Sequence, residues 1–514
     1  MDKSYLTTLS RRQFIRQAAC AALGTGALGA AIRDLRFMNA AVAQSNITDY
    51  KALVCIFMAG GNDSNNLIVP TINSEYNSYA SIRTPVLAIP QGSLLNISPM
   101  NSDGHDYGLH PVCQGIGANS TLGLKPLFDA GRLAILFNSG TLAYPLTKAQ
   151  YNSTPSKRPP QLFSHADQVT QWQTSVPDQP PINGWGGRTA DLLNSVQSNA
   201  PVSLSITLAG ANTFEVGNTV SQYSVSTSGA IPFQGISGAR QTALTNILKQ
   251  VYPNMQAQAY SDVAYHSLNT GSLLNNAIGA TANINSTTQF WTIPFPGNGT
   301  SGAPKLTNPV SNSVFSSGLG PQLNMIARLI EAGSRSVGQG GFGMLRQIFF
   351  CQVGGYDLHT GQTDVPVGGN VLNGAHSNLL YELSHCMAVF QAAIDQIGAM
   401  PTHSDPNFAN RVTSFTASDF GRTFPCNGLG SDHGWGSHHV IMGGAVHGQQ
   451  TYGKFPTLTV GGPDDTSTGR WIPTTACDQY FATLATWFGV DSSNLSAAFP
   501  NLGRFPTPNL GFMG

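Results

Sequence analysis

The chain has 514 residues, with 25 Lys and Arg against 25 Asp and Glu, so its formal net charge is zero. A nucleic-acid-binding protein normally carries a basic excess, and long disorder needs low hydrophobicity with high net charge, so this composition argues against both. The length suits one large α/β domain or two ordinary ones, and it is enough to bury a core without disulfide staples.

Residues 1–43 have the features of an export signal. The pair Arg11-Arg12 precedes an uncharged stretch of 15 residues, 18–32, and Ala41-Val42-Ala43 has the form of a signal-peptidase site. That stretch is shorter than the roughly 20 residues that span a bilayer, so we expect a cleaved twin-arginine signal rather than a membrane anchor. The twin-arginine translocase is then an expected partner, and the mature protein, 44–514, is expected to be periplasmic or extracellular without stable membrane insertion.

Apolar runs alternate with helical patterns along the mature chain. Continuously apolar runs are typical of strands buried on both faces of a parallel sheet, and they occur at 52–58, 132–137, 347–353 and 412–417. An apolar stripe with helical spacing predicts a helix over 380–397, and another helix is expected at 321–332. The sequence therefore predicts an α/β fold with a largely parallel central sheet flanked by helices. Cys55 and Cys351 lie inside two of the runs and are expected to be buried.

Acidic side chains follow three of these predicted strands. Asp63, Asp357 and Asp419 each stand just beyond an apolar run, and the carboxyl ends of parallel strands meet in one crevice. Because converging carboxylates repel one another unless a cation lies between them, the pattern favours a metal site. A single Asp at such a position would be ordinary turn chemistry.

Histidines strengthen the metal hypothesis. Eight of the twelve fall between His359 and His447. His359 lies two residues after Asp357, and a glycine-rich segment beyond the fourth strand holds Asp432-His433 and His438-His439. Only one of that last pair need face a metal, and we take His438. Imidazole and carboxylate together suit divalent ions such as zinc, manganese or iron, and calcium is a further candidate. His376 and His385 are better explained as core or surface histidines.

The nucleophile is the least defined part of the predicted site. Ser164, beside His165, is the first candidate, because a hydroxyl needs a base or a metal to activate it. Ser64, Ser139 and Thr141 compete, and Ser164 could instead be the N-cap of a helix. Arg422 could bind an oxyanion or could hold the carboxylates.

Residues 195–320 differ from the rest of the chain. They are rich in Ser, Thr, Asn, Gln and Gly and have few charges. We expect an inserted polar cap or subdomain, partly helical over 239–252, that shapes access to the crevice.

The motifs of the mature chain resemble those of domain-of-unknown-function family 1501, an exported bacterial family. They are Gly60-Gly61-Asn62-Asp63, Gly108-Leu109-His110-Pro111, Phe163-Ser164-His165, Gly184-Trp185-Gly186-Gly187-Arg188, Gly355-Tyr356-Asp357-Leu358-His359, Ser418-Asp419-Phe420-Gly421-Arg422, Asp432-His433, Ile472-Pro473-Thr474-Thr475, Trp487-Phe488-Gly489 and Phe499-Pro500-Asn501-Leu502. The family usually has Arg where this chain has Phe163 and Glu where it has Asp419.

That family in turn resembles the alkaline phosphatase and sulfatase superfamily, whose members hold two divalent metals with Asp and His at strand ends. By this resemblance Asp63, Asp357 with His359, Asp419, and Asp432 with His433 are successive ligand groups. The superfamily often has Asp-His where this chain has Asp419-Phe420. The Cys-x-Pro-x-Arg motif of ordinary sulfatases is absent from the sequence.

These patterns favour an exported metal-dependent hydrolase acting on small or polymeric phosphate or sulfate esters. Departures at Phe163 and Phe420 keep open a non-catalytic binding or assembly protein on a degenerate hydrolase scaffold. A third possibility is a metal-dependent enzyme with another substrate, such as a polysaccharide, or with a redox centre.

Overall fold

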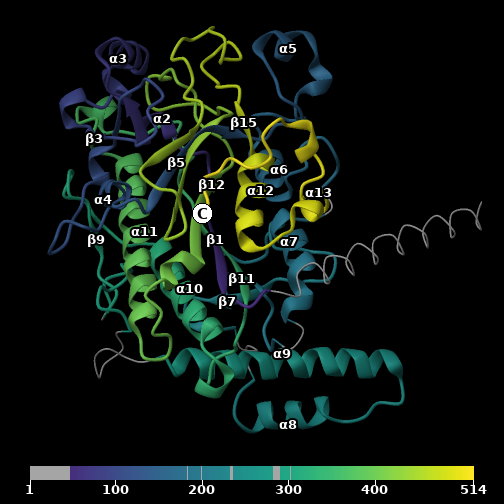
Figure 1. Ribbon diagram of the computed structural model, residues 1–514. Helices are drawn as coiled ribbons and strands as arrows, with labels where there is room; N and C mark the ends of the chain where they lie inside the picture. The colour runs from purple at the N-terminus through teal and green to yellow at the C-terminus, as the bar shows by residue number, and fades with distance from the viewer. Residues whose placement is uncertain (1–46, 182, 198–199, 232–235, 282–289, 301) are drawn as a thin grey trace, which may run out of the picture.

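The computed structural model describes residues 47–181, 183–197, 200–231, 236–281, 290–300 and 302–514. The predicted export signal, 1–43, lies outside these residues. In the described part of the chain a ten-stranded sheet runs through the molecule in the order β14-β5-β13-β12-β1-β11-β6-β7-β8, with β15 paired to β5 (Figure 1). These strands are β1 (Lys51–Met58), β5 (Leu133–Gly140), β6 (Ser205–Thr207), β7 (Tyr223–Ser226), β8 (Gly229–Ala230), β11 (Arg346–Val353), β12 (Val412–Ser418), β13 (Ser437–Gly443), β14 (Gln450–Gly453) and β15 (Thr475–Ala476).

Most neighbouring strands in the sheet are parallel, as predicted. β1 pairs in parallel with β11 and β12, β6 with β11 and β7, and β14 and β15 with β5. The four predicted strands correspond to β1, β5, β11 and β12. β13 is antiparallel to both β5 and β12. Its first three residues, Ser437–His439, belong to the segment that the sequence predicts to be a glycine-rich loop beyond the fourth strand, and here they begin a strand instead.

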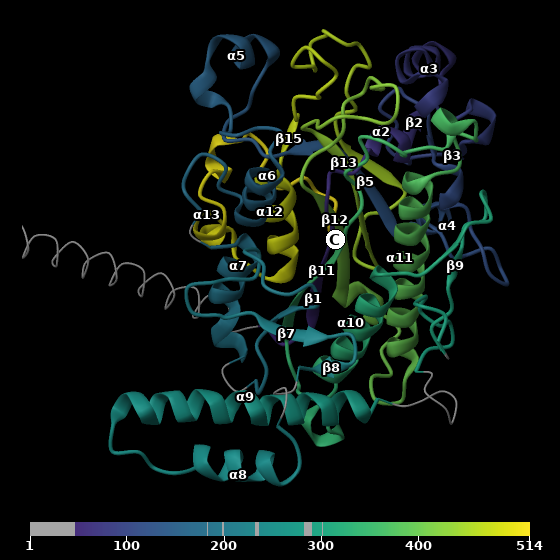
Figure 2. The same ribbon diagram turned by 180° about the vertical axis from the view of Figure 1, so that it is seen from behind.

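The sheet separates two hydrophobic cores, and this explains the continuous apolar runs. Alternate side chains of β1, beginning at Ala52, pack towards α10 (Leu319–Ser334) and α11 (Ala375–Ala399). The intervening side chains, beginning at Leu53, pack towards α7 (Trp185–Leu193) and α12 (Cys477–Phe488). Figure 2 shows the same two helical layers from behind, with the strands between them. A strand whose two faces are both buried needs apolar residues at every position.

The two predicted helices are confirmed. α11 buries the whole apolar stripe, which consists of Leu380, Leu383, Met387, Phe390, Ile394 and Ile397. α10 covers the helix expected at 321–332. The remaining elements are α2 (Ser64–Leu67), β2 (Ile68–Pro70), α3 (Asn73–Leu87), β3 (Leu95–Ile97), β4 (Tyr107–Leu109), α4 (Leu124–Asp129), α5 (Lys148–Ser153), α6 (His165–Thr174), α8 (Ala239–Leu248), α9 (Met255–Gly279), β9 (Leu306–Thr307), β10 (Val314–Phe315) and α13 (Leu495–Ala498).

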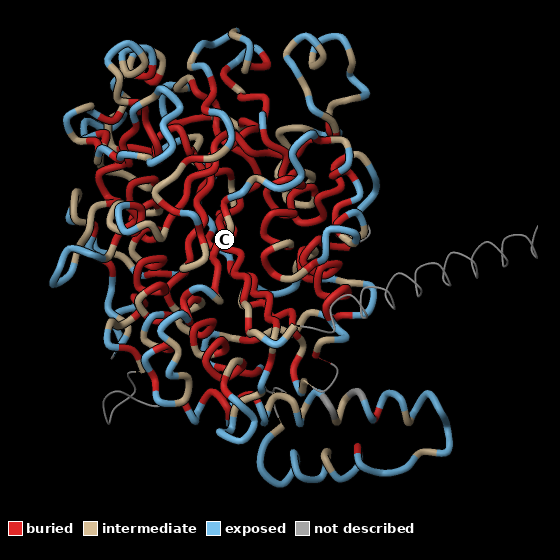
Figure 3. Tube along the Cα trace, viewed as in Figure 1, coloured by how far each residue is buried: buried red, intermediate tan, exposed pale blue. Residues whose placement is uncertain are grey.

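The polar segment 195–320 includes a helical pair, α8 and α9. This pair is largely exposed and lies at the bottom of Figure 3. In Figure 1 it is at the end of the molecule opposite α2 and α3, which follow the carboxyl end of β1. A cap over the strand ends would therefore have to come from other parts of this segment.

Cys55 and Cys351 are buried in the sheet, as predicted. All six cysteines among the described residues are free thiols. None of the described helices is both long and apolar enough to cross a membrane.

We predict that the free energy of unfolding falls as the pH drops from about 6.5 towards 4. Burial lowers the pKa of His110 and of His439 to about 3. Below the unfolded pKa of about 6.5 the unfolded chain binds protons that the folded protein does not, so stability is lost as the pH falls. Above that pH the two histidines are neutral in both the folded and the unfolded chain, so they do not make the free energy of unfolding depend on pH.

His110→Asn tests this effect. The Nδ1 atom of His110 accepts a hydrogen bond from the Val112 N–H at 3.3 Å, and an Asn Oδ1 can take its place. Between pH 5 and 6, the free energy of unfolding measured with urea should depend on pH less steeply in this variant than in the wild type, by about 1 kcal/mol per pH unit. His447→Asn, at a histidine that is exposed rather than buried, provides the control. An unaltered slope in His110→Asn would contradict the prediction.

Candidate functional site

The loops that follow β1, β11 and β12 meet at the carboxyl edge of the sheet. Gly60, after β1, has φ +117°, and a Cβ atom there would lie 2.4 Å from the backbone nitrogen of Asp357. Only glycine allows the two loops to come this close. The N–H of Gly60 donates to Oδ1 of Asp419, which directly follows β12, at 3.0 Å. The contact therefore joins all three loops.

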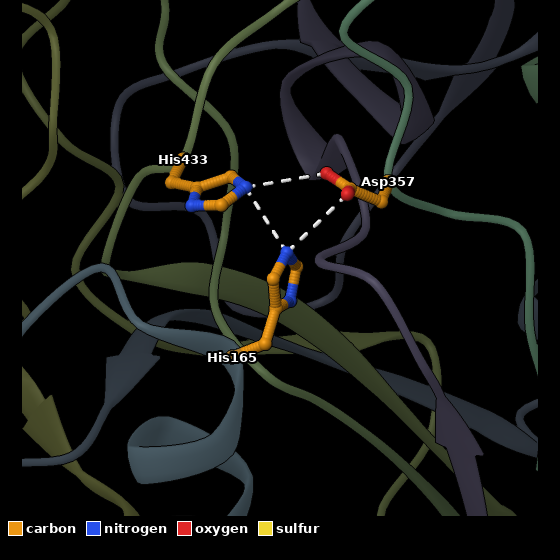
Figure 4. Close-up of side chains that lie close together, drawn as sticks. All are labelled: His165, Asp357 and His433. Carbon is orange, nitrogen blue, oxygen red and sulfur yellow. Dashed lines mark hydrogen bonds and ion pairs between the residues drawn. The ribbon is translucent and has the colours of Figure 1, made fainter.

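His165, Asp357 and His433 form a cluster above this junction (Figure 4). One side-chain ligand atom from each lies within 4.8 Å of the other two. Nε2 of His433 is 3.0 Å from Nε2 of His165 and 3.2 Å from Oδ1 of Asp357. Nε2 of His165 is 3.4 Å from Oδ2 of Asp357. The three residues come from the start of α6, the loop after β11 and the loop between β12 and β13.

His359 adds a third imidazole to the cluster. Its Nε2 atom lies 2.9 Å from Nε2 of His433 and 3.2 Å from Oδ1 of Asp357. His433 and Asp357 are therefore shared by two neighbouring sets of three ligand atoms, one containing His165 and the other His359.

The opposite nitrogen of each imidazole is held by an acceptor. Nδ1 of His433 contacts the carbonyl oxygen of Phe163 at 2.8 Å. Nδ1 of His165 contacts Oδ2 of Asp419 at 2.7 Å, and Nδ1 of His359 contacts Oδ1 of Asp432 at 3.0 Å. Because a carbonyl or an ionised carboxylate only accepts, each Nδ1 carries the proton. In the neutral rings all three Nε2 atoms then present lone pairs to the cluster.

Three lone pairs and a carboxylate at these separations repel one another unless a cation lies among them. Ligands on a tetrahedral ion with bonds of about 2.0–2.1 Å are separated by about 3.3 Å, close to the observed spacing. Burial lowers the pKa of His433, which favours its neutral, ligating form. Burial works against the charge of Asp357, but the hydrogen bond and the charge of Arg422, with smaller contributions from His165 and His359, together outweigh it and hold the pKa below its usual value.

The cluster is open to solvent on one side and closed on the other. The Asp357 side chain is 46% exposed and the His359 side chain 42%. On the closed side the buried Phe420 ring lies 4.8 Å from the ring of His165 and 4.7 Å from that of His433, measured between centroids. A small molecule can therefore reach the ligand atoms while Phe420 restricts the two rings from moving.

Arg422 is buried and holds the Asp357 carboxylate of the cluster in place. Its Nη1 atom donates to Oδ1 of Asp357 at 2.7 Å and to the Gly60 carbonyl at 3.2 Å, and Nη2 donates to the carbonyl of Ser431. Of the two roles predicted for Arg422, these bonds match that of holding a carboxylate.

The other predicted metal ligands occupy different positions. Asp419 and Asp432 contact the imidazoles of His165 and His359 at Nδ1 rather than the cluster itself. Asp63 is buried below the cluster, where it pairs with Arg83 from α3 and accepts from Gln362. His438 is buried in β13, where Nδ1 accepts from the N–H of Asn138 at 3.0 Å and burial lowers its pKa to about 3.

The predicted nucleophile, Ser164, caps α6 beside the cluster. Its hydroxyl donates to Oδ2 of Asp167 at 2.6 Å. Among the described residues, His165 uses both ring nitrogens in contacts with Asp419 and the cluster, and neither bonds to Ser164. The competing Ser64, Ser139 and Thr141 side chains are buried.

Two contributors were not predicted from the sequence. His165 was considered only as a neighbour of Ser164, although its Nε2 atom belongs to the cluster. The backbone carbonyl of Phe163 holds His433, and Phe163 has φ 73°, an unusual value for a bulky residue. The available signal for His165 was its position next to a possible N-cap. Nothing in the residue types indicated that the Phe163 carbonyl would hold His433.

Comparison with known families gives one match. Residues 50–479 match the model of a family described as protein of unknown function (DUF1501). The match covers most of the chain, which therefore belongs to this family. No curated protein matches the chain.

We predict that Asp63→Ala destabilises the fold by about 3–5 kcal/mol, because it leaves the buried Arg83 guanidinium without a counter-charge. Arg83 is fully buried, and besides Asp63 it contacts the carbonyls of Thr423 and Phe424. Urea unfolding at pH 7 measures the effect. The double variant Asp63→Ala/Arg83→Met should recover much of the loss.

The pair of Arg411 and Asp405, at 2.7 Å near the surface, provides the matched control. Asp405→Ala should change stability by less than about 1 kcal/mol. Equal losses for the two Asp variants would show that burial of the Asp63–Arg83 pair has no special importance.

Proposed function

We propose that this member of the DUF1501 family is an exported, metal-dependent hydrolase of phosphate or sulfate esters. The observation that supports it most is the convergence of three imidazole Nε2 atoms and the Asp357 carboxylate at a solvent-exposed position. A hydrogen bond from the far nitrogen of each ligating histidine to a carbonyl or carboxylate is typical of metal centres.

In this proposal His433 and Asp357 hold the metal together with His165, the three residues whose ligand atoms all lie within 4.8 Å of one another. His359 offers a second set of three ligand atoms with the same His433 and Asp357. Imidazole donors favour zinc, manganese or iron over calcium, which takes oxygen ligands. When bound, a divalent ion supplies Lewis acidity and makes water a better nucleophile near neutral pH. A structural zinc site is usually buried and closed by four protein ligands, whereas a catalytic one has three protein ligands and a position open to water. An exposed set of three ligands therefore favours catalysis.

The surrounding residues keep these four side chains in place. Asp419, Asp432 and the Phe163 carbonyl fix the ring orientations of the three histidines, and Arg422 fixes Asp357. We propose water as the nucleophile in preference to Ser164, because the Ser164 hydroxyl is bonded to Asp167 and has no bond to His165.

The substrate class rests on a resemblance. Asp and His residues at the carboxyl ends of a mostly parallel sheet are also the arrangement of the alkaline phosphatase and sulfatase superfamily. We therefore propose an alkaline-phosphatase-like fold, with parts of 195–320 other than α8 and α9 available as a cap. The Arg11-Arg12 motif supports export by the twin-arginine translocase to the periplasm or the cell exterior.

A non-catalytic exported binding or assembly protein on a degenerate hydrolase scaffold is the alternative function. Two observations favour it: protein groups already occupy Nη1 and Nη2 of Arg422, and Phe420 stands where the superfamily often has a histidine. The two proposals differ in whether an ester is turned over.

Single substitutions test the metal proposal. We expect His165→Ala and His433→Ala to fold but to retain less than about a tenth of the wild-type metal, because each removes a ligand. Asp419→Asn should weaken metal binding about 10–100-fold, since it removes only a partner of a ligand. Elemental analysis of protein exported by its native host measures the metal, and circular dichroism checks folding.

His447→Ala, at an exposed histidine outside the cluster, should retain full metal and serves as the control. The same proteins are then assayed on a panel of phosphate and sulfate esters. Full metal content in folded His433→Ala would refute the ligand set. Stoichiometric metal with no turnover on any ester would replace the hydrolase by the non-catalytic alternative.

A further inference from the structure

The loop between β14 and β15 is organised by a buried aspartate. Asp465 is fully buried, and its Oδ1 atom accepts from the backbone N–H groups of Ser467, Gly469 and Arg470 at 2.8–3.2 Å. Its Oδ2 atom accepts from the N–H of Gly461 at 2.7 Å. The backbone of Arg470 is therefore held independently of its own side chain.

This loop brings the guanidinium of Arg470 to the edge of the cluster. Nε donates to the carbonyl oxygen of His433 at 2.8 Å. The guanidinium carbon lies 4.1 Å from the centroid of the Phe163 ring. The Phe163 carbonyl in turn holds Nδ1 of His433. Arg470 thus contacts the two residues that form one side of the cluster.

The two Nη groups of Arg470 have no partner in the part of the chain that the structure describes. In the described ranges they form no hydrogen bond to a protein group and no ion pair with a carboxylate, and the residue is half-buried. Arg422 differs, because its Nη atoms all bond to protein oxygens and its side chain is buried. A guanidinium that is fixed at Nε but retains free Nη donors is prepared to bind a ligand.

We propose that Arg470 binds the anionic group of the substrate beside the metal centre. Its planar fork of N–H donors matches two oxygens of a phosphate or sulfate group. The stack on Phe163 and the bond to His433 hold the side chain before the anion arrives, so less conformational entropy is lost on binding. This inference deepens the proposed function and rests on it for the choice of ligand.

Anion binding by the metal-loaded mature protein tests the inference. Isothermal titration with inorganic phosphate and with sulfate should show binding at least tenfold weaker in Arg470→Ala than in the wild type. Arg470→Lys should fall between them, because it keeps the charge but loses the fork. Metal content should not change in either variant, which separates anion binding from an effect on the position of His433.

Arg158 provides a matched control away from the cluster. Its guanidinium carbon lies 4.1 Å from the Tyr151 ring centroid and its Nε donates to the Tyr151 carbonyl, so Arg158→Ala loses the same two kinds of contact. It should bind both anions as the wild type does.

Four results would overturn the role of Arg470. They are unchanged anion binding in Arg470→Ala, loss of metal in that variant, no anion binding by the wild type at 10 mM, and weakening that Arg158→Ala reproduces. Arg470-dependent anion binding without ester turnover would support Arg470 and reject the hydrolase. Ester turnover with the wild-type KM in Arg470→Ala would support the hydrolase and reject the role of Arg470.

Discussion

The site depends on keeping four electron-rich groups close together. Nε2 of His433 lies 2.9–3.0 Å from Nε2 of His165 and of His359, and all three atoms lie 3.2–3.4 Å from the Asp357 carboxylate. Lone pairs and a carboxylate this close together repel one another without a cation. Rotation of any ring would relieve the repulsion, so the surrounding structure must prevent it. The Nδ1 bonds to Asp419, Asp432 and the Phe163 carbonyl, together with the Phe420 ring, provide that restraint.

The sheet supplies these restraints because its carboxyl edge is built from strands buried on both faces. Asp419 needs no loop to reach the site, since it is the residue after β12, and Gly60 donates to it from the end of β1. The loop between β12 and the antiparallel β13 folds back on itself, and within it Arg422 forms an isolated β-bridge with His433. Two positions within one loop thus hold Asp357 and supply a ligand. The rigidity of the cluster is therefore a property of the sheet edge rather than of any single loop.

The sequence predicted the sheet and the region of the site, because both depend on patterns carried by neighbouring residues. The apolar runs indicated strands buried on both faces. The acidic residues after those strands indicated side chains that meet at one edge of the sheet. The sequence could not separate the proposed metal ligands from the residues that hold them, because Asp suits both roles and only distance distinguishes them. Asp63 illustrates the difficulty: its partner Arg83 lies on another helix, and nothing in the residues around Asp63 indicates a buried ion pair. His165 reaches the cluster from a helix 254 positions from Asp419, a separation that no local pattern encodes.

The two arginines next to the cluster differ in whether protein oxygens already accept from their Nη groups. That difference separates an arginine that holds the site together from one that can bind a ligand. Both carry the same guanidinium, and sequence alone favoured Arg422 because it follows Asp419. Arg422 is buried, and an anion at its Nη atoms would have to displace bonds to Asp357, Gly60 or Ser431. Ser431 is fully buried, so its carbonyl oxygen would lose a donor that water cannot readily replace. Arg470 would lose no protein bond at its Nη atoms on meeting an anion, and its loop is already fixed by Asp465. For a site that selects anionic groups, the arginine that the fold leaves partly unused is the better candidate than the one closest in sequence.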